Sequence, residues 1–343
     1  MQKISVIIPC YNAVLYIDRC LSSIAAQTIG MDCLEVICVD DASTDDTWEC
    51  LRSWERRYPD SVALIRQETN RRQGTAQNVG FAAASADWVA FVDADDWLEP
   101  DYFEKLYGPA LRRGCDVAAC GYVRDGSDAL TCFTEEQKLQ GGRESRYVPA
   151  DTKEARKRLF RFKELGEAAW GKIIRKSFLQ EAQIFFPEGL AYEDHYWMPL
   201  LYMHVSNAYV AAENLYHYFV NPHSTTVSKN RDYHIDLFTV QLRKWSDYER
   251  RGILTEYREE LQHDALRDAW QFLAQVITQY DEPSYSLFQL QRELITEQVP
   301  DYRKDPYIAD FPEIARLFLD ILYLPMSRSE FQQVTAQMKT YWK

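Results

Sequence analysis

One stretch of nine residues constrains the fold of this chain more than any other. Residues 88–92 are mostly apolar, and they run directly into Asp93-Ala94-Asp95-Asp96. A short, continuous apolar run is typical of a strand that is buried on both faces, as in a parallel sheet. The carboxylates would then lie at the C-terminal end of this strand, which is the edge where open α/β sheets bind ligands.

Clustered carboxylates repel each other, so they need a partner of opposite charge. A divalent cation would supply it, because Mg²⁺ commonly joins one or two protein carboxylates to the phosphates of a substrate. In a simpler interpretation the acidic residues form a turn, and Asp95 or Asp96 caps a helix that begins near Pro100. The stretch by itself leaves both interpretations open.

Apolar runs and helical patterns alternate through the first 122 residues, which predicts an α/β fold with a mostly parallel central sheet. Strands are expected at residues 4–8, 34–39, 62–65, 88–92 and 117–122. Helices are expected at residues 17–28, 43–58, 74–84 and 100–113. Parallel strands end at one common edge, so the residues that follow them are expected to share a cleft.

Three strand ends carry side chains suited to a nucleotide. They are Pro9-Cys10-Tyr11-Asn12, then Asp40-Asp41, and then the acidic stretch at residues 93–96. An aromatic ring can stack on a nucleobase, and a carboxylate can accept a hydrogen bond from its N–H group. The chain contains neither G-x-G-x-x-G nor G-x-x-x-x-G-K-[ST], so a dinucleotide site and a P-loop are not expected.

The later part of the chain is expected to be mixed and then helical. Residues 125–146 are expected to form a loop or a loose hairpin, residues 205–211 and 215–219 two strands, and residues from 231 onward helices. Glu193-Asp194 is expected to open a helix. Acidic residues in a first turn favour the helix dipole, so these two carboxylates need no further role.

The composition argues against several kinds of binding partner, cellular location and metal site. The formal net charge of −13 argues against nucleic acids and against an anionic membrane face as partners. No apolar stretch is long enough to span a membrane and no signal-peptide pattern is present, so a cytoplasmic protein is expected. The eight cysteines form no C-x-x-C pair, which argues against a zinc site and a disulfide framework.

Seven segments, taken in order, resemble the family 2 inverting glycosyltransferases of the type that builds bacterial surface polysaccharides. They include counterparts of the family's V-D-D-x-S-x-D, A-R-N-x-G and D-x-D patterns. The segments are Ser5-Val6-Ile7-Ile8-Pro9-Cys10-Tyr11-Asn12, Val39-Asp40-Asp41-Ala42-Ser43-Thr44-Asp45, residues 70–80, Asp93-Ala94-Asp95, Ala169-Trp170-Gly171-Lys172, Glu193-Asp194 and Pro222-His223-Ser224-Thr225. The resemblance covers about residues 3–228.

The resemblance implies a GT-A domain at residues 1–228, followed by a helical C-terminal region at residues 229–343. It also implies a metal-dependent enzyme that moves a sugar, with inversion, from a nucleotide-sugar to an acceptor hydroxyl. The donor is usually a UDP-sugar and the divalent cation Mn²⁺ or Mg²⁺. The acceptor is a growing glycan or a lipid-linked glycan. A cytoplasmic enzyme could meet a lipid-linked acceptor at the inner face of the membrane, with at most peripheral association.

Carried over residue by residue, the resemblance implies that Pro9 and Tyr11 frame the nucleobase and that Asp41 accepts a hydrogen bond from an N–H group of the nucleobase. Asp93 would contact the ribose. Three further residues would line the donor site without a chemical role: Asn12, Asn78 and Ala94.

The resemblance assigns the metal to Asp95 and the catalytic base to Asp194, with Asp96 supporting the water shell of the metal. His223 is a candidate metal ligand or diphosphate donor, although a single histidine in a loop is more often neither. On the acceptor side, Trp170 is the best candidate to stack on a sugar ring.

Two positions depart from the family. Gln77 replaces the arginine of A-R-N-x-G, and Phe219 replaces the arginine of Y-R-x-x-x-x-S. The missing positive charge could come from Arg71 or Arg72, or be absent. These departures keep a second hypothesis open, a catalytically inactive subunit that binds nucleotide-sugars in a polysaccharide assembly complex. A nucleotidyltransferase is less consistent, because the chain lacks a basic glycine-rich loop near its N-terminus. The C-terminal helices would cover the acceptor cleft, form an oligomer contact or touch a membrane, and the many acidic residues of this region make the membrane the least favoured of the three.

Overall fold

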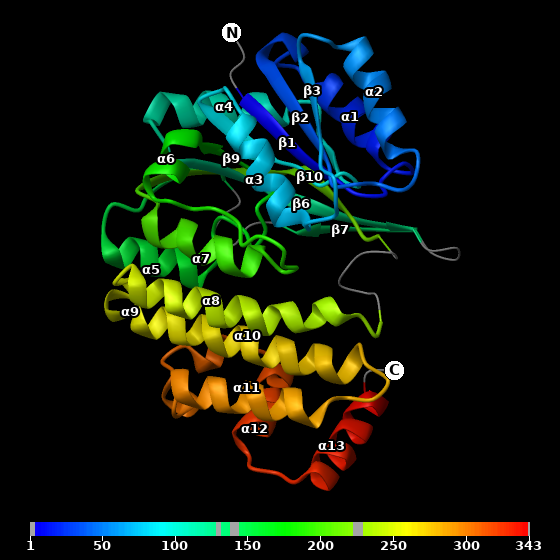
Figure 1. The fold of residues 1–343 in the computed structure, drawn as a ribbon. Helices are drawn as coiled ribbons and strands as arrows, with labels where there is room; N and C mark the ends of the chain where they lie inside the picture. Colours follow the sequence, from blue (N-terminus) through cyan, green and yellow to red (C-terminus); the bar gives the residue numbers. More distant parts are fainter. Residues whose placement is uncertain (1–3, 128–131, 138–143, 222–228, 342–343) are drawn as a thin grey trace. The chain divides into compact units, whose positions relative to one another are not determined.

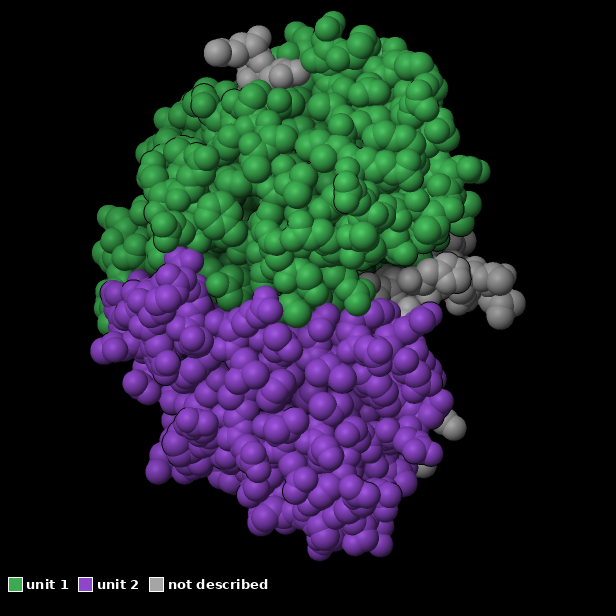
Figure 2. Space-filling model, in the orientation of Figure 1, with its two compact units in different colours: residues 1–222 green, residues 223–343 purple. Residues whose placement is uncertain are grey.

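The computed structural model describes residues 4–127, 132–137, 144–221 and 229–341. The chain divides into two compact units, residues 1–222 and 223–343 (Figure 2). The first unit is built on a mixed sheet and the second is helical (Figure 1). This arrangement confirms the α/β class and the helical C-terminal region that the sequence predicted.

The first half of the sheet is parallel, as expected. Its strands, in spatial order, are β3 (Val62–Arg66), β2 (Leu34–Asp40), β1 (Ile4–Cys10) and β4 (Trp88–Phe91). The register pairs Ile4 with Leu34 on one side and with Trp88 on the other, so the three strands start level. Their C-terminal ends therefore open at the same edge.

Four helices follow these strands along the chain. They are α1 (Ile17–Ala25), α2 (Thr47–Arg57), α3 (Gln73–Ala83) and α4 (Tyr102–Arg113). The helix α3 packs directly on β1 and β2. Gly80 allows this approach, because a Cβ atom there would meet Cγ2 of Ile7 at 2.5 Å.

The second half of the sheet is mostly antiparallel and was only partly foreseen. The strand β9 (Lys172–Arg175) was not predicted; it pairs antiparallel with both β4 and β6 (Val117–Ser127). The expected loose hairpin is present as β6 paired with β7 (Cys132–Gln137). The other elements of this half are β5 (Trp97–Leu98), β8 (Arg146–Pro149), α5 (Lys153–Arg161), α6 (Lys176–Glu181) and α7 (Asp194–His204).

The prediction of two separate strands at residues 205–211 and 215–219 is wrong. One strand, β10 (Asn207–Phe219), runs through both segments and lies parallel to β6. Its register with β6 shifts between Val210 and Asn214 and again before Tyr216. The polar residues between the two apolar runs therefore form an irregularity within the strand rather than a turn.

The second unit consists of helices around a core of its own. Its helices are α8 (Asp236–Arg250), α9 (Ile253–Glu256), α10 (Arg258–Thr278), α11 (Tyr285–Gln298), α12 (Glu313–Tyr323) and α13 (Arg328–Tyr341). Buried Leu266, Leu273, Phe288 and Phe318 are central to its core. In the described parts of both units, no helix combines the length and the apolar character needed to cross a lipid bilayer.

Candidate active site

The loop after β1 is held in place by side chains from the loop after β2. The backbone N–H of Asn12 donates to Oγ of Ser43 at 3.0 Å, and the Asn12 carboxamide oxygen accepts from the N–H of Thr44 at 2.8 Å. Asn12 adopts the left-handed conformation with φ of 49°, which carries strain that these bonds offset. Next to it, Tyr11 is 49% exposed, and Pro9 lies opposite Val39 in the sheet. The family motif after β2 thus shapes the loop that presents Tyr11.

Asp41 is engaged within the same loops. Its Oδ1 accepts hydrogen bonds from the backbone N–H of Arg71 at 2.8 Å and from Nε2 of Gln67 at 2.6 Å. Burial raises the pKa of the Asp41 carboxyl, and the N–H bond from Arg71 opposes that shift. The backbone N–H of Asp41 donates to the carbonyl oxygen of Cys10 at 2.8 Å, so Asp41 lies beside the Tyr11 loop with its carboxylate oriented by one backbone and one side-chain donor.

Asp96 has a structural role in the acidic stretch. It is fully buried, and its two oxygens accept from Oη of Tyr216 at 2.5 Å and from the N–H of Phe219 at 2.7 Å. These bonds tie the end of β4 to β10 and leave Asp96 poorly placed to support the water shell of a metal. The helix-capping interpretation is also wrong: the N-cap of α4 is Asp101, and its side chain makes no capping bond.

Asp93 and Asp95 are the carboxylates that remain for chemistry. Oδ1 of Asp93 accepts from Nε2 of Gln73 at 2.9 Å, and Oδ2 of Asp95 accepts from Nδ2 of Asn221 at 2.9 Å. Burial raises both pKa values, and the charge of Asp95 raises that of Asp93 further. Ala94 is buried between them.

These two carboxylates suit a divalent cation in their chemistry. In the part of the chain that the structure describes, neither forms a salt bridge with a lysine or arginine. Over the same residues, no cluster of three or more His, Cys, Asp or Glu side chains forms a ready metal site. A hard cation would thus take one or two ligands from the protein and the rest from phosphates and water. His223 lies outside the described residues.

Asp194 comes to the same region from a distant part of the sequence. It is the first residue of α7, and its Oδ1 accepts from the N–H of Ala169 at 3.0 Å. Burial raises its pKa to about 6, while the positive charge of Lys172 opposes that shift. The charge of Asp194 in turn raises the pKa of Asp93. The two carboxylates, 101 positions apart in sequence (194 − 93), therefore share one electrostatic environment.

Lys172 belongs to this site, although sequence reasoning gave it no role. Its side chain is buried, and its Nζ donates to the carbonyl oxygens of Ala168 and, at 2.8 Å, Trp170. Burial lowers its pKa to about 8, and the charge of Asp194 opposes that shift. The 168–170 segment thus turns carbonyls toward an ammonium group and an N–H toward a carboxylate. The sequence feature that could have indicated a role for Lys172 is its place in the Ala169-Trp170-Gly171-Lys172 motif.

Gly74 explains how α3 approaches the start of α7. A Cβ atom at Gly74 would lie 2.9 Å from the carbonyl oxygen of Pro187 and 3.2 Å from Cβ of Glu193. Only a glycine permits this contact, which brings the helix that carries Gln73 beside the residue preceding Asp194. The site is therefore assembled by the packing of α3 as well as by the sheet.

Gln77 and Asn78 are placed in α3 as supporting residues. Gln77 is buried, with 1% of its surface exposed, and its Oε1 has no hydrogen-bond partner among the described residues. The carboxamide of Asn78 donates to the carbonyl oxygen of Phe186 at 2.9 Å and accepts from its N–H at 3.0 Å. Asn78 thus holds the segment that leads to α7.

The side chains of Trp170 and Arg71 already have partners within the first unit. The Trp170 ring is stacked on Tyr216, with centroids 4.6 Å apart, and on Tyr218 at 5.5 Å. These contacts fit a packing role better than the stacking on a sugar expected for Trp170. Arg71, a candidate source of positive charge, forms an exposed ion pair with Glu188 at 2.7 Å.

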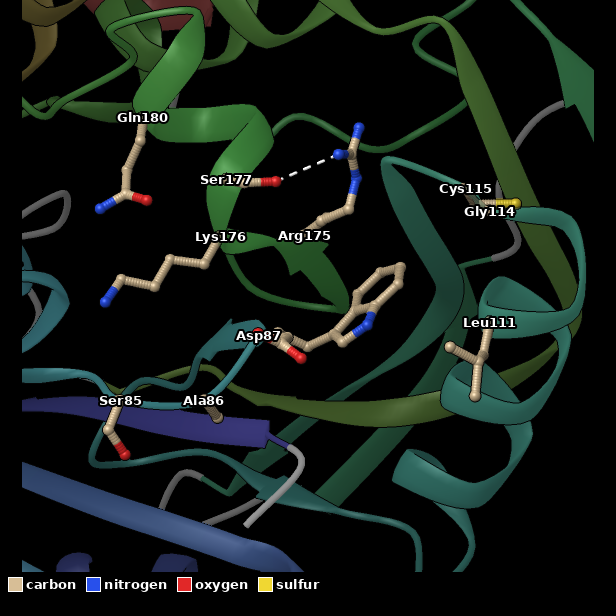
Figure 3. A pocket seen from close by; sticks show the side chains of 11 residues that line it. Ser85, Ala86, Asp87, Leu111, Gly114, Cys115, Arg175, Lys176, Ser177 and Gln180 are labelled. Carbon is tan, nitrogen blue, oxygen red and sulfur yellow. Dashed lines mark hydrogen bonds between the residues drawn. The ribbon is translucent and has the colours of Figure 1, made fainter. Parts of the chain in front are cut away.

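A separate pocket lies at the opposite edge of the sheet, where β4 begins. It has a volume of about 650 Å³, and its lining includes Trp88, Cys115, Arg175 and Lys176 (Figure 3). The Arg175 guanidinium bonds to Asp116 and to Oγ of Ser177, the latter at 3.1 Å. None of the residues predicted to bind donor or metal lines this pocket.

Comparison with known proteins gives consistent results. The model of the family described as Glycosyl transferase family 2 matches residues 5–182. The uncharacterised glycosyltransferase YibD of Escherichia coli K12 is 30% identical over 286 residues, which are 78% of each chain. The poly(ribitol-phosphate) beta-N-acetylglucosaminyltransferase TarS of Staphylococcus aureus is 27% identical over 220 residues, which are 64% of this chain and 35% of TarS.

A crystal structure of residues 1–349 of S. aureus TarS in complex with UDP-GlcNAc superposes with a TM-score of 0.58. The match covers 95% of this chain and 94% of that one, at 18% identity. At this identity the likeness shows the fold alone, and it confirms the fold class that the motifs predicted.

Proposed function

The chain belongs to glycosyltransferase family 2 and has a GT-A fold, and from this premise we propose a metal-dependent transfer of sugar from a UDP-sugar with inversion. The acceptor is a hydroxyl group of a growing glycan or of a lipid-linked glycan. One observation carries the proposal: Gln73, which donates to Oδ1 of Asp93 at 2.9 Å, directly precedes Gly74, and a Cβ atom at Gly74 would lie 3.2 Å from Cβ of Glu193, the residue before Asp194. A candidate base thus lies close to the candidate donor site.

In this proposal the nucleotide binds at the ends of β1 and β2. Tyr11 stacks on the nucleobase beside Pro9, and Asp41 accepts a hydrogen bond from an N–H group of the nucleobase. Tyr11 is 49% exposed and so is accessible for such contact, and the bonds to Gln67 and Arg71 keep Asp41 oriented. Uracil is favoured as the base because TarS, which has the same fold, has been crystallised with UDP-GlcNAc.

Asp95 would hold the divalent cation, with Asp93 beside it at the ribose. Such a cation, Mn²⁺ or Mg²⁺, neutralises the charge that develops on a departing diphosphate. Asp194 accepts the proton of the acceptor hydroxyl as that oxygen attacks the sugar. Its pKa of about 6 leaves it mostly ionised at neutral pH. One base and no protein nucleophile correspond to a single displacement, which inverts the anomeric centre.

Two parts of the proposal concern where the enzyme acts and whether it forms oligomers. A lipid-linked acceptor would be met at the inner face of the membrane by a cytoplasmic enzyme with at most peripheral association. The helical unit is available to join copies of the chain into a homo-oligomer. Sedimentation of the purified protein, with and without vesicles of anionic lipid, tests both ideas.

Calorimetry with UDP, in Mn²⁺ and then in EDTA, tests the donor and metal assignments, with GDP as the control nucleotide. We expect UDP to bind with Mn²⁺ and to bind far more weakly in EDTA. Equal UDP affinity in both conditions would contradict the metal role, and preference for GDP would contradict the choice of base.

A panel of nucleotide-sugars, screened for slow hydrolysis, then identifies the donor. Gln77 and Phe219, at positions where the family has arginine, favour one alternative, an inactive nucleotide-sugar-binding subunit of a polysaccharide assembly complex. That alternative predicts tight binding of one nucleotide-sugar with neither hydrolysis nor transfer.

A further inference from the structure

A row of polar side chains on α1 holds the backbone of the acidic stretch and of the residues that follow it. Cys20 donates from its thiol to the carbonyl oxygen of Asp93 at 3.6 Å, and Arg19 donates from a terminal nitrogen to that of Asp95 at 2.7 Å. Farther along the row, Oγ of Ser23 accepts from the N–H of Leu98 at 3.1 Å. Consecutive residues of one helix therefore bind the backbone at both aspartates of the D-x-D motif.

Arg19 is the member of this row with a permanent charge, and rings hold it in place. The centre of its guanidinium lies 3.8 Å from the Trp97 ring centroid and 4.8 Å from that of Phe219. A planar guanidinium stacks on aromatic faces, which an ammonium group does less well. Two rings and one carbonyl thus fix an otherwise flexible surface arginine.

The charge of Arg19 acts on the acidic stretch. Burial raises the pKa of the Asp95 carboxyl, and the charge of Arg19 opposes that shift. Burial likewise lowers the pKa of Arg19, and the charges of Asp96 and Asp95 oppose that shift. Phe219 occupies the position where the family motif has an arginine, and its ring lies beside this guanidinium. The guanidinium of Arg19 on α1 therefore lies next to Phe219, the position where this chain lacks the arginine of the family motif.

We propose that Arg19 is a positioning residue that holds the Asp93–Asp95 turn in its metal-binding arrangement and supplies the positive charge missing at position 219. The inference rests on the proposed function, because it assumes a metal–diphosphate at Asp95. It assigns Arg19 no contact with the reacting atoms. Its effect is expected on the metal-dependent part of nucleotide binding and not on the base.

The test compares Arg19→Gln with the unaltered protein in two binding measurements. Paramagnetic resonance of Mn²⁺ gives the concentration that half-saturates the protein with UDP present, and calorimetry gives the affinity for metal-free uridine. We expect the half-saturating Mn²⁺ concentration to rise about tenfold and uridine affinity to stay the same. Arg19→Lys should restore less than half of the loss, because lysine keeps the charge without the stacked planar group.

Arg57→Gln is a matched control, because Arg57 is an exposed helical arginine whose guanidinium also lies near two rings, those of Trp54 and Tyr58 at 5.2 Å each. It should change neither measurement. If Arg19→Gln fails to fold, Trp97→Leu, which removes one supporting ring, should raise the Mn²⁺ requirement instead. An unchanged Mn²⁺ requirement in the folded Arg19 variant would overturn the inference alone. An unaltered protein that binds UDP equally well without Mn²⁺ would overturn the metal role first, and the inference with it.

Discussion

Asp194 is the residue whose proposed role can be tested most directly. Asp194→Asn keeps the shape of the side chain and its acceptor oxygen for the N–H of Ala169, but removes the proton acceptor. Loss of a general base lowers kcat by about 10²- to 10⁴-fold, and UDP affinity should barely change. The measurements are kcat with the donor found in the screen, UDP affinity and the melting temperature.

A helix-start carboxylate without a catalytic role predicts a different result for the same variant. The helix would lose about 0.3–1 kcal/mol of dipole interaction, and kcat per folded molecule would stay close to the original value. Such a result would remove Asp194 as the base. Glu193, buried directly before it, would then be the next residue to test.

Lys172→Met should move the pH dependence of the reaction. Lys172 lowers the pKa of Asp194, His195 lowers it too, and Asp194 acts as a base only when ionised. Removing the lysine charge therefore raises that pKa above about 6, and the acidic limb of the kcat profile shifts to higher pH. Glu193 and Asp93 remain as neighbouring acids whose own pKa values Asp194 raises. The check is kcat between pH 5 and 9, a range that includes the Asp194 pKa of about 6 and the higher values expected for the variant.

A lower kcat with an unmoved acidic limb would show that Lys172 only supports the fold of the 168–170 segment. Lys176→Met is the matched control. Lys176 also gives its ammonium hydrogen bond to a backbone carbonyl, that of Ala84, but it lines the pocket at the opposite edge of the sheet. It should leave the pH profile in place.

Sequence patterns identified the residues of the site, but they did not predict the contacts that those residues make. Asp93, Asp95 and Asp194 were named from motifs, and the structure brings Asp93 and Asp194 into one electrostatic environment. The structural use of Asp96 could not be foreseen, because its partners Tyr216 and Phe219 lie on a strand more than a hundred residues away. A motif identifies a carboxylate, but the distant donors around it decide whether its lone pairs are available.

At the scale of elements, the strands with long apolar runs were predicted and the short or irregular ones were not. The strand β9 has four residues, of which only Ile173 and Ile174 are apolar, and it directly precedes a helix, so no apolar run marks it. In β10, the polar residues near Asn214 suggested a turn, whereas pairing with β6 carries the strand through them with a shifted register. In both cases the neighbouring strands decide the structure, and they are remote in sequence.

The close approach of α3 to the segment before α7 gives an element-scale prediction. Gly74→Ala places a methyl group 2.9 Å from the carbonyl oxygen of Pro187, which is backbone and has to move. We expect a loss of about 1–3 kcal/mol in unfolding free energy, as for other overpacked sites, despite the higher helix propensity of alanine. Because the shift also moves Glu193 and the start of α7, kcat should fall while uridine affinity persists.

Gly108→Ala is the matched control for that prediction. It lies in α4, and its added methyl group would meet only Nη1 of Arg112, at 3.4 Å. Alanine is the better helix former, so stability should stay the same or rise by up to about 1 kcal/mol. Urea unfolding of both variants and kcat give the comparison. Equal behaviour of the two would mean that the contact at Gly74 does not determine the position of α7.

At the scale of the whole molecule, every residue assigned to donor, metal or base lies in the first unit, apart from His223, which the structure does not describe. The second unit has its own core and its own buried ionic cluster. In that cluster, Nζ of Lys244 lies 2.6 Å from Oδ2 of Asp264 and also contacts Asp268, and all three side chains are at most 1% exposed. Stability and nucleotide binding should therefore respond to different substitutions.

Lys244→Met tests this separation. It removes the ammonium group from buried Asp268 and Asp264, of which Asp264 keeps its ion pair with Arg267 at 2.5 Å. Removing one partner of a buried ion pair costs about 3–5 kcal/mol. Arg52→Ala, which breaks an exposed pair with Glu49, should cost less than about 1 kcal/mol. Urea unfolding gives both values, and calorimetry with UDP and Mn²⁺, below the melting temperature, should give the affinity of the unaltered protein for both variants. If folded Lys244→Met protein binds UDP more weakly, the helical unit contributes to the donor site and the assignment of that site to the first unit alone is wrong.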